Sequence, residues 1–255
     1  GNVRVQKVGP LRYGIISDIH GNLEAFDAVL EDLEQEEIEV YLCLGDIVGY
    51  GANPNECLDR VWELTSQVIA GNHDHAAVGK LDIISFNHMA ADAALWTMQH
   101  LTRNARHYLR ELPLTRRHGH ILAVHGAPTQ PDKWPYLITL DQVGVEFPAL
   151  PDDTTLCVVG HTHTPGIFEM NDAEEVCRHI HGYTYQMQSE CRYIVNVGSV
   201  GQPRDGDSRA AFCVYDTETY LLEIKRTTYD IESAQKKICR AGLPAMLAER
   251  LAYGQ

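Results

Sequence analysis

Short apolar runs recur along residues 13–159 of the chain, and each is followed within two residues by Asp, Asn or His. The runs cover residues 13–17, 40–44, 67–70, 120–124 and 156–159. Continuous apolar runs of this length are typical of buried parallel strands, which deliver their carboxyl ends to one edge of a sheet. We therefore expect the five runs to lie side by side in one sheet and the polar residues after them to form one cluster.

The stretches between the first three runs have the periodicity of amphipathic helices. Residues 23–33 place apolar side chains at positions 23, 26, 29, 30 and 33, on one helical face. Asn22 can cap this helix, and its position beside His20 also makes it a candidate for contacting a substrate. A second helix is predicted from Pro54 to Thr65, with proline in its first turn. Strand, helix and strand thus repeat at close to the roughly 30 residues of a βαβ unit.

The rest of the chain divides into a helical part and a strand-rich part. Residues 79–117 are spaced for two or three helices, with no strand pattern before Ile121, and residues 140–147 predict a short helix ended by Pro148. After residue 163, short strands are predicted at 166–169, 176–180, 183–187, 193–197, 211–215 and 220–225, then helices at 231–240 and 244–252. The predicted fold class is α/β. Two packed mixed β-sheets are flanked by helices in a four-layer αββα sandwich, formed by one domain over residues 1–255 with a helical insertion at about 79–117.

Composition restricts the compartment and the partners. Hydrophobic residues make up 44% of the 255 residues, which is enough for a full core, and the formal net charge is −14. This charge argues against a surface that holds nucleic-acid polymers, but a bound metal can still supply local positive charge for a phosphate. The seven cysteines are odd in number and form no Cys-x-x-Cys pair, which favours buried reduced thiols. With no signal peptide or membrane-length apolar run, we expect a cytoplasmic protein without a membrane partner.

The polar residues at the predicted strand ends are the types that bind transition metals. Asp18 and His20 are two residues apart, so on an extended segment their side chains leave on the same side, and His161 and His163 repeat this spacing. Asp46 has two carboxylate oxygens with which it could bridge two ions. Asn72 and His125 add neutral donors and complete the candidate ligand set. Imidazole with carboxylate favours Mn, Fe, Zn, Ni or Co over Mg or Ca. Two such ions roughly 4 Å apart can clamp the oxygens of an in-line phosphoryl displacement.

Five motifs, in this order, resemble those of the calcineurin-like metallophosphoesterases, and the closer detail resembles their compact bacterial and archaeal branch of phosphodiesterases and phosphatases. They are Asp18-x-His20, Gly45-Asp46, Gly71-Asn72-His73-Asp74, His125-Gly126 and Gly160-His161-Thr162-His163. The resemblance implies two divalent metal ions, with manganese the expected ion in vitro. The implied ligands are Asp18, His20 and His163 for the first ion, Asn72, His125 and His161 for the second, and Asp46 as the bridge.

The same resemblance implies the catalytic residues. His73 would lie beside the substrate phosphate and either stabilise the transition state or protonate the leaving oxygen, and Asp74 would orient His73. The implied nucleophile is metal-bound hydroxide. The Ser/Thr protein phosphatases of this superfamily have an Asp-Arg pair where Gly49 and Tyr50 stand here, so their phosphate-binding arginine is missing at this position. Arg204 therefore has two candidate roles, a contact with the substrate anion and a salt bridge within its loop.

The predicted function is hydrolysis of a small phosphoester substrate, either a phosphodiester, a phosphomonoester or a nucleotide. Cleavage of dinucleoside polyphosphates is an alternative within the family. A non-catalytic scaffold of the same fold is a second alternative, which the complete ligand set disfavours. A metal-dependent nuclease is a third, and the acidic net charge counts against long polymers. The sequence does not determine the substrate, the native metal or the oligomeric state.

Overall fold

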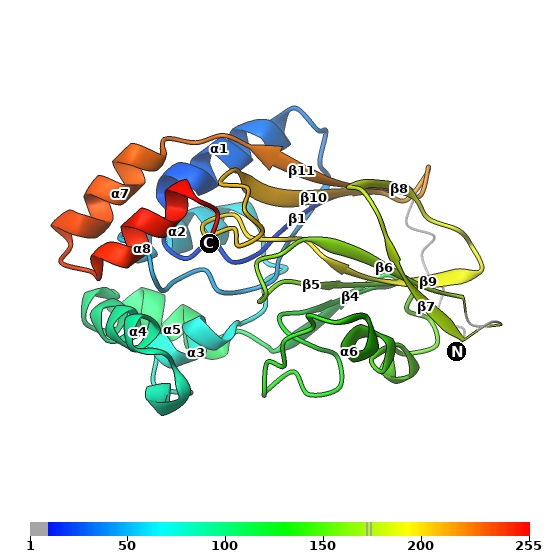
Figure 1. Ribbon diagram of the computed structural model, residues 1–255, viewed down its shortest axis with the longest axis horizontal. Coiled ribbons are helices and arrows are strands. Elements are labelled where there is room, and N and C mark those ends of the chain that lie inside the picture. Colours follow the sequence, from blue (N-terminus) through cyan, green and yellow to red (C-terminus); the bar gives the residue numbers. More distant parts are fainter. Residues whose placement is uncertain (1–9, 172, 174) are drawn as a thin grey trace, which may run out of the picture.

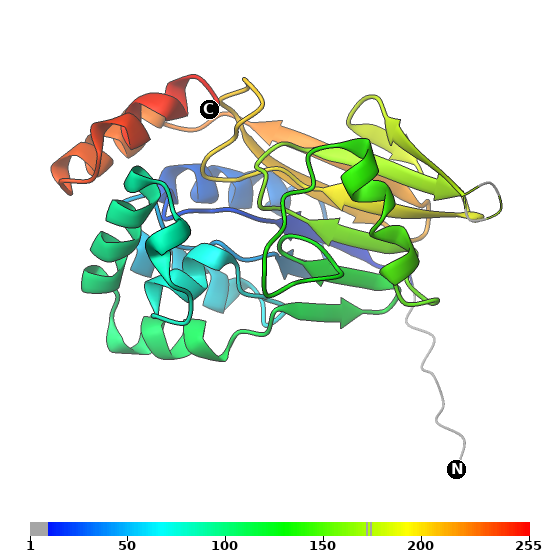
Figure 2. The same ribbon diagram turned by 60° about the horizontal axis from the view of Figure 1, so that its bottom comes forward.

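The computed structural model describes residues 10–171, 173 and 175–255, and these form two β-sheets packed face to face with helices outside. Figure 1 shows the strands toward one end of the molecule and most helices toward the other, with β1, β10 and β11 in a layer above β4 and β5. Figure 2, with the bottom of the molecule turned forward, shows the segment that contains α6 in front of the strands. The predicted class of two mixed sheets flanked by helices is confirmed. No helix within the described residues has the length and apolar character needed to cross a membrane.

The first sheet has five strands in the order β2-β1-β10-β11-β8. Its strands are β1 (Arg12–Ile16), β2 (Val40–Cys43), β8 (Thr184–Gln186), β10 (Ala210–Asp216) and β11 (Leu221–Thr227). Strands β1 and β2 are parallel, whereas β10 runs antiparallel to β1 and the other neighbours are also antiparallel. Side chains of the inward faces, among them Ile15 and Leu42, meet the second sheet in a continuous apolar core.

The second sheet has six strands in the order β3-β4-β5-β9-β6-β7. Its strands are β3 (Thr115–His118), β4 (Ile121–Val124), β5 (Leu156–Val159), β6 (Gly166–Asn171), β7 (Val176–Ile180) and β9 (Cys191–Asn196). Strands β4, β5 and β9 are parallel, and antiparallel strands complete the sheet. The parallel strands β4 and β5 are buried throughout, as their apolar sequences predicted.

Helices cover the outer faces of both sheets and one end of the sandwich. The α-helices are α1 (Leu23–Glu34), α2 (Pro54–Leu64), α3 (Asn72–Ala77), α4 (His88–His100), α5 (Arg103–Glu111), α6 (Leu140–Gly144), α7 (Ile231–Arg240) and α8 (Ala245–Glu249). Three short 3-10 helices are η1 (Ile83–Ser85), η2 (Phe147–Ala149) and η3 (Arg250–Ala252). Helices α1 and α2 pack on the first sheet through residues such as Phe26 and Val61, and α6 packs on the second through Val143. All seven cysteines are free, and five of them are buried.

Three details differ from the sequence prediction. The apolar runs do not lie in one sheet, because β1 and β2 belong to the first sheet and β4 and β5 to the second. The run at residues 67–70 is not a full strand and makes only the isolated bridge between Cys43 and Val68. The stretch at 79–117 contains helices α4 and α5, but its last residues form the edge strand β3, which pairs with β4. The polar sequence of β3 gave no apolar signal for a strand.

Candidate metal centre

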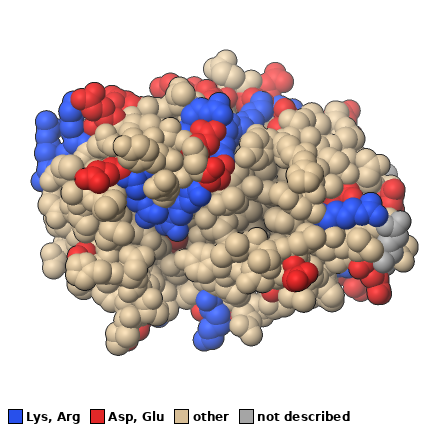
Figure 3. All heavy atoms as spheres, in the orientation of Figure 1, with Lys and Arg blue, Asp and Glu red and all other residues tan. Residues whose placement is uncertain are grey.

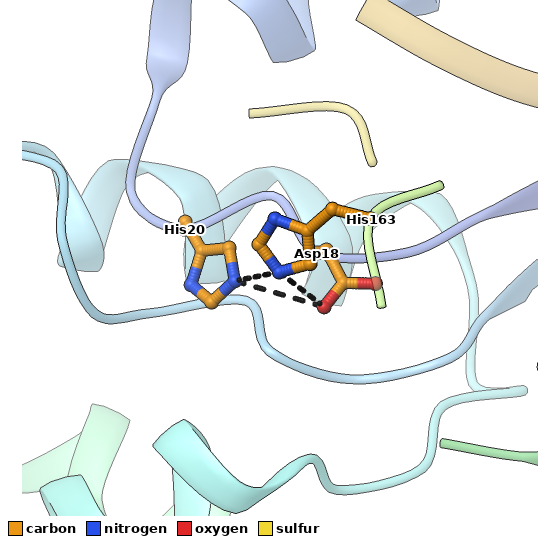
Figure 4. Close-up of side chains that lie close together, drawn as sticks. All are labelled: Asp18, His20 and His163. Carbon is orange, nitrogen blue, oxygen red and sulfur yellow. Dashed lines mark hydrogen bonds and ion pairs between the residues drawn. The ribbon is translucent and has the colours of Figure 1, made fainter. Parts of the chain in front are cut away.

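Asp18, His20 and His163 converge after strands β1 and β5, from positions far apart in the sequence. Figure 4 shows the two imidazole rings turned toward one carboxylate oxygen. His163 Nε2 lies 3.2 Å and His20 Nε2 lies 3.6 Å from Asp18 Oδ1, and the two Nε2 atoms are 3.1 Å apart. All three side chains are buried, and the three ligand atoms lie within 4.8 Å of one another. They could hold one metal ion.

A second group of the same kind lies beside the first. Asp46, His125 and His161 also bring three ligand atoms within 4.8 Å of one another. Asp46 Oδ2 is 3.2 Å from His125 Nε2 and 3.7 Å from His20 Nε2, so this carboxylate lies between the two groups. Asn72 Oδ1, at the start of α3, is a further buried oxygen without a hydrogen-bond partner.

Each of the two carboxylates has one oxygen held by the protein and one left open. Asp18 Oδ2 accepts hydrogen bonds from Ser17 Oγ and the backbone N–H of His161, and Asp46 Oδ1 accepts one from the backbone N–H of His73. The other oxygens, Asp18 Oδ1 and Asp46 Oδ2, are buried without a partner. Buried polar atoms in native proteins are normally paired, so open atoms converging on one place indicate a missing ligand.

The histidines are arranged in the same way. His20 Nδ1 donates to the carbonyl of Val48 at 3.1 Å, and His125 Nδ1 donates to the carbonyl of Leu44 at 2.8 Å. His163 Nδ1 donates to the carbonyl of Gln202 at 2.5 Å. A proton on Nδ1 leaves the Nε2 lone pair directed at the cluster, which is how proteins orient metal-binding imidazoles. The side chains present therefore fit divalent cations in both their donor types and their orientation.

The electrostatics of the cluster also favour a cation. Burial alone would raise the pKa of Asp18, but interactions with His163 and His125 lower it well below its usual range. Asp46 is affected in the same sense, so that its pKa is also lowered in spite of burial. Burial would lower the pKa of His125, but Asp46 and Asp18 raise it to about 9. Two buried carboxylates thus stabilise positive charge at this place.

The backbone at five ligand positions is left-handed, whereas the argument from residue spacing had assumed an extended backbone. Five ligand residues have φ between 51° and 66°, a region that non-glycine residues seldom occupy: Asp18, His20, Asp46, His161 and His163. Left-handed single residues cost of order 1–3 kcal/mol each and persist where the surroundings impose them. The strain is concentrated in the segments that carry the ligands.

Two motif glycines leave room for the carboxylates. A Cβ on Gly71 would lie 2.0 Å from Asp46 Oδ1, and a Cβ on Gly160 would lie 2.4 Å from Asp18 Oδ2. Both distances are far shorter than any tolerated contact, so only glycine allows these backbone segments to approach so closely.

The sequence profile of the calcineurin-like phosphoesterase superfamily domain matches residues 11–220. The chain belongs to this superfamily. An uncharacterised protein of Methanocaldococcus jannaschii is 39% identical over 249 residues, which cover 94% of this chain and 97% of that protein. The crystal structure of a metallophosphoesterase from Sphaerobacter thermophilus aligns with a TM-score of 0.83 and 38% identity, over 97% of this chain and 100% of that one.

A third relative shows the same fold at lower identity. A hypothetical protein of Pyrococcus horikoshii aligns with a TM-score of 0.76 and 22% identity, covering 96% of this chain and 98% of that chain. The family predicted from the five motifs is therefore confirmed, and so is its bacterial and archaeal branch. Family membership and the two ligand groups together support metal-dependent hydrolysis of phosphoester bonds.

Asp74 in this phosphoesterase binds backbone N–H groups, and its predicted role in orienting His73 stays a prediction. No hydrogen bond joins Asp74 to His73 within the described residues, and His73 Nδ1 is buried without a partner. Asp74 instead accepts backbone N–H bonds from Asp46 at 2.7 Å, Gly71 at 2.9 Å, Ile47 at 3.0 Å and Val48 at 3.3 Å. Burial and the neighbouring Asp46 raise the pKa of Asp74 to about 7. Asp74 thus fixes the backbone that carries Asp46.

Asn22 caps helix α1 of the phosphoesterase chain, as one of its two predicted roles required. Its Oδ1 accepts from the N–H of Ala25 at 3.2 Å, and its Nδ2 donates to the carbonyl of Gly201 at 2.9 Å. The side chain is buried and both of its polar atoms are engaged, and its contact with a substrate phosphate stays a prediction.

Arg204 lies at the rim of the centre. Its Nε and Nη2 donate to Gln202 Oε1 at 3.2 and 2.7 Å, and its backbone N–H donates to the carbonyl of the candidate ligand His163. The guanidinium is 5.6 Å from the ring centroid of Tyr50. No carboxylate in the described part of the chain pairs with Arg204, so the loop salt bridge is not the arrangement present. Arg204, from a distant loop, thus lies beside Tyr50, which occupies the position of the phosphate-binding arginine in the protein phosphatases.

Sequence reasoning missed the aromatic residues around this site. Tyr136 stacks on His161 with ring centroids 4.0 Å apart, and Tyr50 and Phe86 contact the ring of His73. Trp134 packs against His75. In the sequence, Tyr50 stands out only as a departure from the protein phosphatases. No periodicity marks these positions, because their proximity arises from tertiary packing.

Proposed function

We propose that this protein hydrolyses phosphoester bonds of a small molecule or nucleotide with two divalent ions held by the candidate ligands. The observation that carries the proposal is the convergence of buried, unpaired ligand atoms in two adjacent groups. Five such atoms are Asp18 Oδ1, Asp46 Oδ2, Asn72 Oδ1, His125 Nε2 and His161 Nε2. The mixed nitrogen and oxygen donors suit Mn, Fe, Zn, Ni or Co, and we propose Mn for activity in vitro.

The ions, when bound, would supply positive charge that activates water and neutralises the phosphoryl oxygens. The ligands for one ion would be Asp18, His20 and His163, and those for the other Asn72, His125 and His161. Asp46 would bridge the two, since its open oxygen lies within 3.7 Å of a histidine from each group.

His73 would donate a hydrogen bond to the reacting phosphoryl group. Its ring is centred 5.0 Å from that of His20, which places it at the edge of the cluster. Burial lowers the pKa of His73 well below its ordinary value, so the imidazole is neutral at pH 7. A neutral imidazole retains one N–H and can stabilise developing negative charge, which favours this role over full proton transfer to the leaving oxygen.

Arg204 would bind the substrate anion from the opposite rim. It is partly buried, and its interaction with Tyr50 restricts its position. Burial and the neighbouring Arg204 lower the pKa of Arg250, so two guanidinium groups lie near each other there. Figure 3 shows Lys and Arg atoms gathered close to the place where the C-terminus lies in Figure 1. Local positive charge on an acidic protein is suited to a small anionic substrate.

The test is hydrolysis of generic chromogenic phosphomonoesters and phosphodiesters by protein stripped of metal and reloaded with Mn²⁺. We expect turnover only after reloading, and the preferred substrate distinguishes a phosphatase from a phosphodiesterase. Asp46→Asn should abolish turnover and reduce the content of both ions measured by elemental analysis. If a protein containing two ions hydrolyses neither substrate, the catalytic proposal fails and the scaffold alternative takes its place.

A further inference from the structure

A cavity of about 380 Å³ opens beside the candidate metal centre, and both aromatic and polar side chains line it. One wall contains His73, His161 and Asn72, the residues nearest the proposed reaction. The volume lies within the range of small-ligand sites, which are commonly apolar with a few polar groups. Its position means that a group attached to the reacting phosphate would enter it.

Four aromatic side chains from three separate parts of the chain meet at this cavity. They are Tyr50 after β2, Phe86 between η1 and α4, and Trp134 and Tyr136 in the segment between β4 and α6. Tyr136 stacks on the buried His161 at a ring distance of 4.0 Å, yet 48% of the residue remains exposed. A ring fixed on one side and open on the other can stack against a planar ligand.

Trp134 forms a fixed part of the cavity wall. The residue is only 8% exposed, and its backbone is left-handed, with φ of 45°. A Cβ on Gly126 would lie 2.8 Å from Trp134 Cα, so only glycine lets the two segments pack this closely. Gly126 follows the candidate ligand His125, so the metal-site motif also positions the tryptophan.

Polar side chains complete the lining. Ser85, Asn87 and Lys133 also face the cavity and supply further hydrogen-bonding groups. Planar faces for stacking, with a few donors and acceptors at their edges, are the features by which proteins bind heterocyclic bases.

We infer that this cavity binds the nucleobase of a nucleotide substrate whose phosphate lies at the metal centre. The inference rests on the proposed phosphoesterase function and specifies its substrate class. Tyr136 and Phe86 provide the stacking surfaces, and Trp134 forms part of the cavity wall. These residues select the substrate, whereas the metal ligands and His73 act on its phosphate.

The experiment compares adenosine 5′-monophosphate with ribose 5-phosphate, which has the same phosphate and sugar but no base. Both are used as competitors in initial-rate hydrolysis of a chromogenic phosphoester by the metal-loaded protein. We expect the nucleotide to inhibit about 10-fold more tightly or better, which is the size of one base-stacking contact. Tyr136→Leu and Phe86→Leu should each remove most of this difference by weakening binding of the nucleotide alone. Trp62→Leu, which changes an exposed aromatic residue on α2, is the matched control and should leave both constants unchanged.

Equal inhibition by the two competitors in an active protein overturns the base-binding inference and leaves the phosphoesterase proposal intact. The same conclusion follows if Tyr136→Leu weakens both competitors equally, because the tyrosine would then act only through His161. If the metal-loaded protein hydrolyses no phosphoester, the proposed function fails. Binding of adenosine 5′-monophosphate and of ribose 5-phosphate is then measured by calorimetry in place of the competition assay. A preference for the nucleotide in that measurement would support the cavity assignment independently of catalysis.

Discussion

Replacing Asp74 with asparagine separates two roles for this residue. The structure assigns Asp74 to the backbone that carries Asp46, since its carboxylate accepts four backbone N–H bonds of 2.7–3.3 Å. The family resemblance instead assigned it to His73. Asp74→Asn keeps the shape of the side chain, but its amide nitrogen replaces one accepting oxygen with a donor. That nitrogen would face two backbone N–H groups, which are also donors.

The loss of unfolding free energy can be calculated from these hydrogen bonds. Each oxygen of Asp74 accepts two of the four hydrogen bonds, so asparagine retains two and loses two. Hydrogen bonds to charged groups contribute about 1.5–3 kcal/mol each, which gives a loss of about 3 kcal/mol or more. For a domain of this size the unfolding midpoint falls by about 2–4 °C per kcal/mol, and hence by about 6–12 °C.

The measurement is thermal unfolding with elemental analysis at pH 8.5, above the pKa of about 7 that burial and Asp46 give Asp74. We expect a lower midpoint together with weaker metal retention, because the Asp46 backbone is released. Asp153→Asn makes the same chemical change at an exposed residue that pairs with Arg117, and should leave the unfolding midpoint unchanged. A midpoint for Asp74→Asn within about 2 °C of the parent protein, with activity lost, would refute the backbone role.

Two further predictions follow from single side chains. His73→Ala should lower kcat by about 100-fold, as for other lost transition-state donors, while elemental analysis still finds both ions. Loss of metal from this variant would show that His73 is a ligand. Burial would raise the pKa of Glu36, but hydrogen bonds from Lys225 and Arg12 lower it. The stabilisation from this depressed pKa is present above the unfolded value of about 4.3 and disappears as pH falls through the folded value. Glu36→Gln should therefore lower the unfolding free energy by about 1 kcal/mol at pH 7 and not at pH 2, as measured by urea denaturation. An equal effect at both pH values would contradict this assignment.

The argument that polar residues follow the ends of parallel strands predicted that these residues meet, even though it placed all the strands in one sheet. Asp18 and Asp46 follow strands of the first sheet, whereas His125 and His161 follow strands of the second. Parallel strands in both sheets end at the same edge of the sandwich, so polar residues from the two layers still meet. The order of the motifs and the types of residue were therefore sufficient to predict which side chains meet. The sheet to which each strand belongs did not change that prediction.

Features that depend on contacts between distant segments were not accessible from the sequence. Nothing local distinguishes Tyr136 from an ordinary exposed loop aromatic, because its role depends on stacking against His161. Asp74 directly follows His73, yet its carboxylate is used by a different segment of the chain. The left-handed backbone at Asp18 and His20 is likewise imposed by tertiary hydrogen bonds, such as those from their N–H groups to the carbonyls of Gly45 and Asp46.

The metal centre and the fold are linked by the way the carboxylates are held. One oxygen of Asp18 and one of Asp46 are satisfied by the protein, and this fixes the other oxygen in a buried position without a partner. A buried unsatisfied polar atom costs about 1–3 kcal/mol. Bound cations would pair the open oxygens of both carboxylates and remove that cost. The hydrogen bonds to Asp18 and Asp46 thus orient the two carboxylates before a cation binds. Because these bonds form only in the folded protein, cation binding also stabilises the fold.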